Sequence, residues 1–344
     1  MSSAEFSFDF PYAYGAPALR GVLRQQPGYF YVEEQLGFEP AGEGEHVFLF
    51  VEKTGLNTQF LAEKIAAFAQ VSSRLVSYSG MKDRHAVTRQ WFSVHVPGKQ
   101  TFDWQQLNSE QITVLAAQRH VKKLKRGTHR SNFFRICIDD IEGDSQQLQQ
   151  RAEKIRLQGF PNYFGEQRFG HAGNNIVKAQ RWFAGEYKPK KHQRGIYLSA
   201  VRSWLFNQVL AQRIRANNWQ TLSRGELLML EGSHSVFPQS DDSDLTQRLS
   251  IGDIHLTGPL YGKASKLCVS DDVADLEQPI LDRFPDLLDG LERHGLTAER
   301  RALRTIAQNF QCKLEGQQLF LEFALPKGCF ATALVRELVD YKTA

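Results

Sequence analysis

The pattern of hydrophobic and polar positions predicts strands and one helix in the first half of the chain. Alternating or continuous apolar runs predict strands at residues 29–34, 46–51, 75–78, 90–96 and 133–138. A helix is expected after the second strand, capped by Asn57, because Leu61, Ile65 and Phe68 recur at spacings of four and three. The segment 80–88 is a polar connection between two predicted strands, which is a usual position for chemistry held on a rigid scaffold.

The rest of the chain, from residue 144, predicts three more helices and one more strand. A helix over 144–158 ends at Gly159, and a longer one over 199–216 begins at Ser199 as its cap. The pattern weakens past residue 220, and 232–244 is expected to be a loop because it is rich in Ser and Asp. A strand follows at 317–325 and a final helix at 331–341. The interspersed helices and strands predict an α+β fold.

Length and composition describe an ordinary soluble globular protein. The 344 residues favour two domains, and 42% of them are hydrophobic and 23% charged. The four cysteines are scattered without a CxxC pair, so a disulfide framework or zinc site is not expected. The N-terminal sequence lacks the basic and apolar regions of a signal peptide, and no apolar run approaches the roughly 20 residues of a membrane span. A cytoplasmic protein without a membrane partner is therefore expected.

Positive charge is concentrated in two runs, although the net charge is only +4. Residues 119–130 (RHVKKLKRGTHR) contain six Lys or Arg and no acid, and residues 188–194 (KPKKHQR) contain four. A solvated surface is the ordinary interpretation of one such run. Two runs on an otherwise nearly neutral chain indicate segregated charge, which favours a nucleic-acid partner.

Several catalytic motifs are missing from the sequence: it has no Walker loop, no HExxH, no GxSxG and no GxGxxG after a strand. What remains is an aspartate, Asp83, between Lys82 and Arg84. Adjacent cations favour the ionised carboxylate, which is available as a nucleophile or a base. An ordinary charged turn has the same composition, and by physics alone it is the more frequent case.

Five motifs, in order along the chain, resemble the TruD family of tRNA pseudouridine synthases. The segment 80–94 (GMKDRHAVTRQWFSV) resembles the signature around the active-site aspartate of that family. The others are 30–34 (FYVEE) with 42–46 (GEGEH), Lys53 and 57–58; 132–134 (NFF); 161–170 (PNYFGEQRFG); and 326–332 (PKGCFAT) with 336–338 (REL). Only residues 220–310 lack a recognisable motif, so the resemblance covers most of the chain.

The resemblance implies two domains. A catalytic domain with a mixed, mostly antiparallel sheet flanked by helices would comprise residues 1–157 and 306–344. A smaller α+β domain, the TRUD domain, would be inserted at 158–305. The sequence gives independent though limited support, because the strand at 317–325 and the helix at 331–341 have no nearby partners in chain order. RNA would bind in a basic cleft between the domains.

The activity implied by the resemblance is the isomerisation of uridine to pseudouridine in tRNA, at uridine 13 of the D-arm. Nothing is added or lost in this reaction, so no cofactor and no metal is expected. Asp83 matches the catalytic position, where a carboxylate either attacks C1′ or removes the C2′ proton of the ribose. The sequence leaves both routes open.

The resemblance also implies residues that bind the substrate. Three phenylalanines match positions near the target base, and an asparagine is placed to bind the uracil edge: Phe30, Phe134, Phe330 and Asn132. Taken singly, each Phe is more often a core residue. Lys82 and Arg24 would hold phosphates and keep Asp83 ionised, although many relatives are expected to have Lys in place of Arg24. Arg168 is expected to be a buried ion-pair partner.

Two other functions stay open at this stage. A non-catalytic RNA-binding or RNA-folding protein would use the same basic cleft, but it gains nothing from an anionic Asp83 facing phosphates. A hydrolase of the glycosidic bond would need a second carboxylate, which only the fold could supply from Glu33 or Glu45. A tRNA substrate and a monomeric enzyme are expected. The identity of the tRNAs and the role of the insert are not encoded in any residue that we can name.

Overall fold

The computed structural model describes residues 6–98, 100–233, 235–240, 243–264 and 266–344, and these residues form two compact units. The first unit contains residues up to 17, 150–306 and 329–338; the second contains 18–149, 307–328 and 339–344. The predicted domains have different bounds at the N-terminal segment and at 329–338. The division into a catalytic domain and an inserted domain therefore stays a prediction, and each unit is described by itself.

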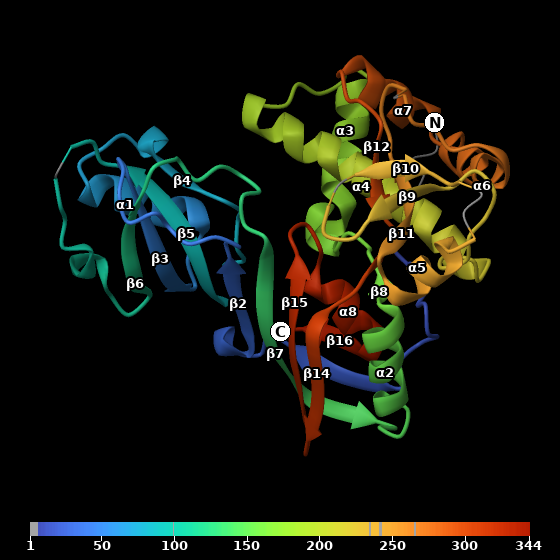
Figure 1. Ribbon diagram of the computed structural model, residues 1–344, viewed down its shortest axis with the longest axis horizontal. Helices are drawn as coiled ribbons and strands as arrows, with labels where there is room; N and C mark the ends of the chain where they lie inside the picture. The colour runs from blue at the N-terminus through green and yellow to red at the C-terminus, as the bar shows by residue number, and fades with distance from the viewer. Residues whose placement is uncertain (1–5, 99, 234, 241–242, 265) are drawn as a thin grey trace. The chain divides into compact units, whose positions relative to one another are not determined.

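The second unit is built on one mixed sheet (Figure 1) with the strand order β14-β15-β7-β2-β5-β3-β6. The strands are β1 (Leu19–Leu23), β2 (Phe30–Gln35), β3 (His46–Thr54), β4 (Val76–Tyr78), β5 (Val87–His95), β6 (Ile112–His120), β7 (Ser131–Gly143), β14 (Gln308–Glu315), β15 (Gln318–Pro326) and β16 (Val339–Thr343). Most pairs are antiparallel, whereas β2 with β5 and β1 with β16 are parallel. The predicted α+β fold with a mostly antiparallel sheet is confirmed.

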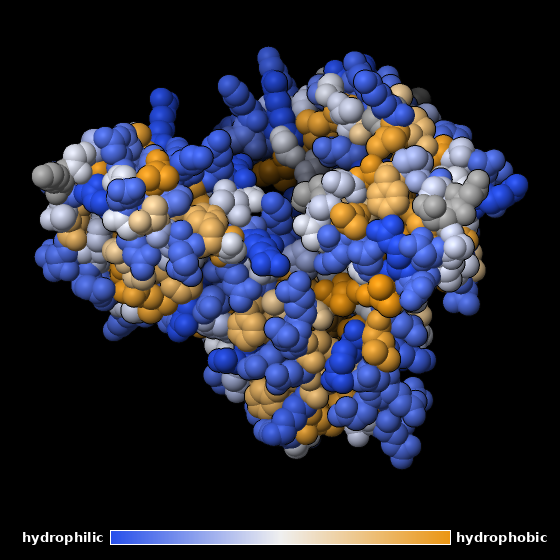
Figure 2. All heavy atoms as spheres, viewed as in Figure 1, coloured by the Kyte–Doolittle hydropathy of each residue, from blue (hydrophilic) through white to orange (hydrophobic). Residues whose placement is uncertain are grey.

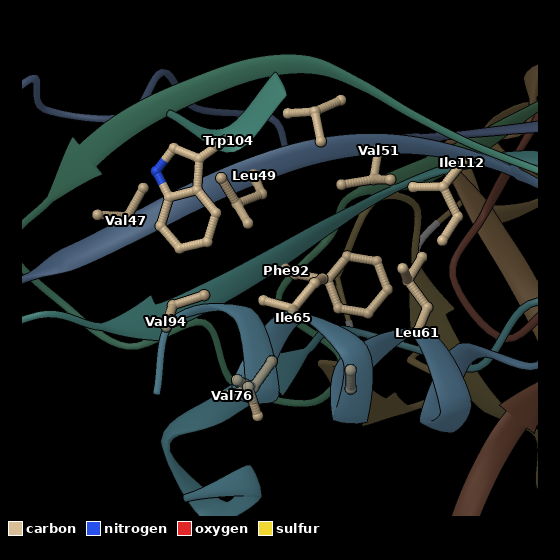
Figure 3. Packing of buried hydrophobic residues seen from close by; sticks show 14 of the residues in the cluster. Val47, Leu49, Val51, Leu61, Ile65, Val76, Phe92, Val94, Trp104 and Ile112 are labelled. Carbon is tan, nitrogen blue, oxygen red and sulfur yellow. The ribbon is translucent and has the colours of Figure 1, made fainter. Parts of the chain in front are cut away.

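Helix α1 (Thr58–Phe68) covers β3 and β5 and closes a hydrophobic core. Figure 3 shows Leu61 and Ile65 of the helix pointing toward Leu49 of β3 and Phe92 of β5, all of them fully buried. Burying each of these side chains stabilises the unit by about 1.5–3 kcal/mol. The predicted spacing is therefore confirmed, and Asn57 occupies the N-cap position, although its side chain makes no capping hydrogen bond.

The described part of the second unit also contains three short 3-10 turns. They are η1 (Pro27–Tyr29), η2 (Ser73–Leu75) and η3 (Trp104–Leu107). The strand predicted from residue 75 begins at Val76, because Ser72 caps the preceding turn by accepting a hydrogen bond from the Arg74 amide. This turn leads the chain into β4, whose end opens the polar connection at 79–86.

The first unit is organised around the long helix α4 (Lys191–Arg215), which packs against α3, α7 and the strand β11. Its four-stranded sheet has the order β10-β9-β11-β12 (Figure 1). The remaining elements are α2 (Leu148–Gln158), β8 (Phe160–Pro161), η4 (Glu166–Arg168), η5 (His171–Gly173), α3 (Asn174–Phe183), β9 (Leu227–Leu230), β10 (Val236–Pro238), α5 (Leu245–Ile251), β11 (Ile254–Leu260), α6 (Asp271–Leu281), α7 (Pro285–Arg293), β12 (Glu299–Ala302), β13 (Arg304–Thr305) and α8 (Ala331–Leu338).

Three predicted helices are wrong at one end, and one predicted loop contains a strand; the helix expected from residue 144 begins at Leu148. Helix α4 begins at Lys191 rather than at Ser199, because the Gln193 side chain accepts a hydrogen bond from the Lys190 amide and caps the helix earlier. The final helix ends at Leu338, and the following residues form β16, which pairs with β1 from the start of the chain. The segment expected to be a loop contains β10, while residues 234, 241 and 242 of that segment lie outside the described residues.

The surface of the molecule is mixed in character. The face drawn in Figure 2 is mostly hydrophilic, with separate hydrophobic patches between the polar side chains. Helices with the length and apolar composition of a membrane span are absent from the described part of the chain. Cys137 and Cys329 are free thiols.

Candidate active site

The loop 79–86 between β4 and β5 carries Asp83, and buried side chains hold it in place. Thr58 Oγ1, at the start of α1, accepts a hydrogen bond of 2.9 Å from the Lys82 amide. Gln90 Nε2, on β5, donates to the Gly80 carbonyl at 3.2 Å, and Thr58 donates to Gln90 Oε1 at 2.9 Å. Since Thr58 and Gln90 are almost fully buried, the loop is fastened to the core on both sides of the helix–sheet packing.

Lys53 also holds this loop, through hydrogen bonds to main-chain carbonyls. Its ammonium group donates to the Asp83 carbonyl at 2.9 Å and to the Leu56 carbonyl at 2.7 Å, and the residue is fully buried. Burial lowers the pKa of Lys53 to about 8, against the opposing effect of the Asp83 charge. A buried cation that binds two main-chain carbonyls fixes the backbone of the aspartate, while the carboxylate makes other contacts.

The carboxylate of Asp83 pairs with Arg24, the residue that follows β1. Arg24 Nη2 lies 2.7 Å from Asp83 Oδ2, while Asp83 Oδ1 accepts a hydrogen bond of 3.0 Å from the His85 amide. The Arg24 guanidinium also lies over the Phe30 ring, 4.3 Å from its centroid. The two charged side chains are 12% and 19% exposed, so the pair is accessible from solvent at one edge.

Arg24 itself has a left-handed backbone with φ of 65°. This conformation costs a residue with a Cβ on the order of 1–3 kcal/mol, and it persists only where the surroundings enforce it. Here the ion pair with Asp83 and the Phe30 ring on which the guanidinium lies provide such an environment. Strained backbone of this kind concentrates at functional sites.

Lys82 points into the unit and pairs with a buried carboxylate. Its Nζ lies 2.5 Å from Glu34 Oε2, and the two side chains are 7% and 0% exposed. Glu34 also accepts a hydrogen bond from the Trp91 amide at 3.3 Å. Burial raises the pKa of Glu34, and the ammonium of Lys82 opposes that rise. Lys82 is therefore engaged with Glu34, and its expected role toward phosphates stays a prediction.

His129 and Asn132 lie next to this pair. His129 Nδ1 is 2.5 Å from Ser79 Oγ, and His129 Nε2 is 3.4 Å from Asn132 Nδ2. Burial, assisted by Lys82 and Lys327, lowers the pKa of His129 to about 4, so the imidazole is neutral at physiological pH. Asn132 Oδ1 is a buried acceptor without a hydrogen-bond partner among the described residues. An unpaired buried acceptor is the group that a ligand donor satisfies.

The predicted aromatic residues divide between the two units. In the second unit Phe30 meets Phe134 edge to face with centroids 6.3 Å apart, and Phe134 stacks on Phe323 at 5.4 Å. Both Phe30 and Phe134 are buried, and the Arg24 guanidinium lies over the Phe30 ring. In the first unit the half-buried Phe330 meets Phe164 at 5.8 Å.

Arg168, in the first unit, does not form the expected ion pair. Its guanidinium donates to Ser199 Oγ at 3.2 Å and lies 5.7 Å from the ring centroids of Phe164 and Phe330. No carboxylate lies within ion-pair distance among the residues that the structure describes, and Arg168 Nε is a buried donor without a partner there. Arg168 therefore interacts with aromatic faces and a hydroxyl rather than with an acid.

The sequence model of the family described as tRNA pseudouridine synthase D (TruD) matches residues 10–188 and 180–338. Curated relatives named tRNA pseudouridine synthase D include those of Aeromonas hydrophila, 43% identical over 97% of this chain and 94% of theirs, and Hydrogenovibrio crunogenus, 41% identical over 97% and 96%. The chain belongs to the TruD family. A crystal structure from Methanosarcina mazei, assigned to the same family, has the same fold, with 20% identity, a TM-score of 0.70 and 95% coverage of each chain.

Membership of the TruD family confirms the resemblance drawn from the five motifs, and it makes the chain one of the pseudouridine synthases, a class of isomerases. The non-catalytic alternative has no support from these comparisons. The carboxylates that a hydrolase would recruit are engaged elsewhere: Glu33 pairs with Arg89 at 3.3 Å, and Glu45 with His95 at 3.4 Å. Groups of three or more His, Cys, Asp or Glu that could hold a metal do not occur among the described residues.

Several residues that hold the loop of Asp83 were not assigned a role from the sequence. They are Lys53, Thr58, Gln90, Glu34, Ser79 and His129. Lys53, Thr58 and Glu34 lie in the first motif, and Gln90 lies in the aspartate motif. The motifs therefore included these residues, but they did not indicate which groups the side chains contact. His129 was counted only as part of a basic run, and no local signal separates a buried neutral histidine from an exposed one.

Proposed function

We propose that the protein isomerises uridine 13 in the D-arm of tRNA to pseudouridine, with Asp83 as the catalytic residue. The observation that carries this proposal is the Arg24–Asp83 pair, which holds a carboxylate at a solvent-accessible edge of a loop fixed by the buried core. The Arg24 guanidinium, 2.7 Å away, pairs with the carboxylate that either catalytic route uses. Membership of the TruD family supplies the reaction class.

The reaction exchanges one bond of the uracil for another. The N1–C1′ bond breaks, the base rotates, and C5 bonds to C1′. C5 then loses its proton and N1 gains one, so the atoms and electrons balance without a cofactor. Asp83 either attacks C1′ or removes the C2′ proton, and both routes start from the same ionised carboxylate.

The proposed substrate contacts follow from the chemistry of the site. Asn132 offers its unpaired Oδ1 to a donor of the uracil edge, and Phe30, Phe134 and Phe330 are the aromatic contacts of the base. Arg24 orients the Asp83 carboxylate. Lys82 acts indirectly, because its ion pair with the buried Glu34 anchors the loop that carries Asp83. The proposal includes a cytoplasmic, monomeric enzyme. It also includes a catalytic domain of residues 1–157 and 306–344 with the insert 158–305.

The test is a pseudouridine assay on an unmodified tRNA transcript that has uridine at position 13. Carbodiimide labelling followed by primer extension locates any pseudouridine. Wild type is compared with Asp83→Ala, and the matched substrate control is the same transcript with cytidine at position 13. We expect a stop at position 13 with wild type only, and no stop on the cytidine transcript.

Two results would overturn parts of this proposal. A wild-type stop elsewhere in the tRNA, retained on the cytidine transcript, rejects uridine 13 as the target. A stop at position 13 that persists with Asp83→Ala rejects Asp83 as the catalytic residue. Release of free uracil would indicate hydrolysis instead of isomerisation.

A further inference from the structure

A groove of about 520 Å³ lies on the second unit, away from the contacts described for Asp83. It is lined by residues of α1, of η2 and β4, and of the segment 123–126 that follows β6. The lining residues used here are Gln59, Glu63, Ser77, Lys123, Lys125 and Arg126. The groove thus brings the centre of the first basic run together with a helix that is far from it in sequence.

The groove carries an excess of positive charge. Three cations face one carboxylate, Glu63, which already accepts a hydrogen bond of 3.1 Å from Gln59 Nε2. Lys123 Nζ donates to the Arg74 carbonyl at 3.2 Å, which leaves its charge unneutralised. Within the described part of the chain, no carboxylate forms an ion pair with Lys123, Lys125 or Arg126. Cations that are grouped on one segment without acidic partners favour an anionic ligand.

The groove is continuous with the catalytic loop. Its lining residues Ser77 and Tyr78 are followed directly by the loop 79–86. The Gly127 amide, next to the basic segment, donates to the Ser79 carbonyl at 2.8 Å. Lys327 Nζ donates to the Gly127 carbonyl at 2.7 Å and fastens the same turn. The basic segment and the loop of Asp83 are therefore linked by a backbone hydrogen bond within one unit.

From these observations we infer that the groove binds the sugar–phosphate backbone of the tRNA segment that flanks the target uridine. Enzymes that act on a base take it out of the stack, and the strand on either side must be held while the base is displaced. Phosphate contacts of this kind fix position without reading sequence. The cations supply these contacts, since Ser77 Oγ shares a hydrogen bond of 2.9 Å with Ser93 Oγ and Gln59 Nε2 donates to Glu63. The inference rests on the proposed function only in that RNA is the ligand.

The test compares two double variants with the same change of net charge. Lys123→Glu with Lys125→Glu alters the groove. Lys313→Glu with Lys342→Glu alters exposed lysines on β14 and β16 of the same unit. Binding to unmodified tRNA transcript is measured between 50 and 200 mM salt (roughly the range over which phosphate contacts are lost), with Asp83→Asn in every protein to prevent turnover.

We expect the groove variant to raise the Kd about tenfold or more at moderate salt, since two phosphate contacts become repulsive. The slope of log K against log salt falls by about two, one for each lost contact. The control variant stays within about twofold of the parent in Kd, with an unchanged slope. Equal effects in the two variants would reject the groove as a binding site and leave only the general influence of net charge.

Steady-state kinetics with Asp83 intact distinguish an effect on tRNA binding from an effect on the position of the loop. A binding groove raises the KM of the Lys123→Glu, Lys125→Glu variant and leaves kcat within about twofold. A fall in kcat at unchanged KM would overturn the inference, because the segment would then act on the loop alone. Circular dichroism verifies folding. If the charge reversal does not fold, Lys123→Gln with Lys125→Gln is measured instead, with half the change of charge and a correspondingly smaller Kd effect.

The two proposals fail separately. If wild type makes no pseudouridine at position 13 while the groove variant still weakens tRNA binding more than the control, the proposed position fails and the groove stands. If position 13 is modified but the two double variants bind alike, the groove fails and the proposed function stands.

Discussion

Buried charges occur in both units, but they are arranged differently. In the first unit Arg300 binds Glu277 through two hydrogen bonds of 2.6 and 2.7 Å, and Arg213 pairs with Glu226 with both side chains fully buried. In each of these pairs, cation and anion neutralise one another. Around Asp83 there is one such closed pair, Lys82–Glu34, but the buried Lys53 binds main-chain carbonyls instead, and the carboxylate of Asp83 stays 19% exposed next to Arg24.

The contrast indicates what each cluster is for. Closed pairs are costly to break, because either partner left alone is an uncompensated buried charge. They maintain the packing of the first unit and offer nothing to a ligand. The cluster of the second unit fixes a backbone and leaves one anionic group at the surface, which is the arrangement of a preorganised catalytic residue. The following predictions test this distinction, from the largest effect to the smallest.

Asp83→Asn is expected to reduce the rate of pseudouridine formation about a thousandfold or more, because a neutral amide is neither nucleophile nor base. Stability changes by less than about 2 kcal/mol, since the Asn side chain keeps an acceptor for the His85 amide. Single-turnover kinetics and urea denaturation measure the two effects. A loss of tRNA affinity much beyond a few-fold would make Asp83 a structural residue and remove the contrast.

Arg213→Ala in the first unit is expected to cost about 3–5 kcal/mol of unfolding free energy, because it leaves Glu226 charged or forces it to bind a proton in a dry site. The control is Arg224→Ala, which breaks the exposed pair with Asp272 and is expected to leave the denaturation midpoint almost unchanged. Chemical denaturation measures both. Similar values for the two variants would show that the buried pair is not the closed structural contact described here.

His129 predicts acid sensitivity of the second unit. Its pKa is near 4 when folded and near 6.5 when unfolded, so the unfolded chain binds more protons between these values. Stability therefore falls as the pH drops from about 6.5 to 4, by at most about 3 kcal/mol from this group. His129→Gln flattens that part of the curve relative to wild type. Parallel pH curves in urea denaturation would show that His129 is not held neutral.

Lys53→Met is expected to lower kcat between about tenfold and a hundredfold, because the loop of Asp83 loses its buried anchor. Stability changes little at neutral pH, since an apolar side chain replaces a buried charge. Wild type becomes more stable as the pH rises from about 8 to 10.5, where the unfolded lysine still binds its proton, and the variant lacks this rise. The control is Lys64→Met on the exposed side of α1. An unchanged kcat would contradict the positioning role.

Local periodicity was sufficient for much of the fold. The spacing of Leu61, Ile65 and Phe68 gave α1, and alternating positions gave β2, β3, β7 and β15, because a helix or strand that covers a core repeats its buried side chains at a fixed interval. The ordered motifs placed the chain in its family and pointed to Asp83. These are properties of residues that are near one another in sequence.

Tertiary structure alone decided the pairings between distant residues. Arg24 contacts the Asp83 carboxylate and Lys53 contacts the Asp83 carbonyl because β1, β3 and β5 belong to one sheet. The loop of Asp83 leads directly into β5. The same cause makes residues after Leu338 a strand, since β1 offers hydrogen bonds that a helix end cannot. Such contacts depend on chain topology, which no periodicity in a single segment encodes. The sequence motifs therefore pointed to Asp83, and the fold determined which side chains hold it.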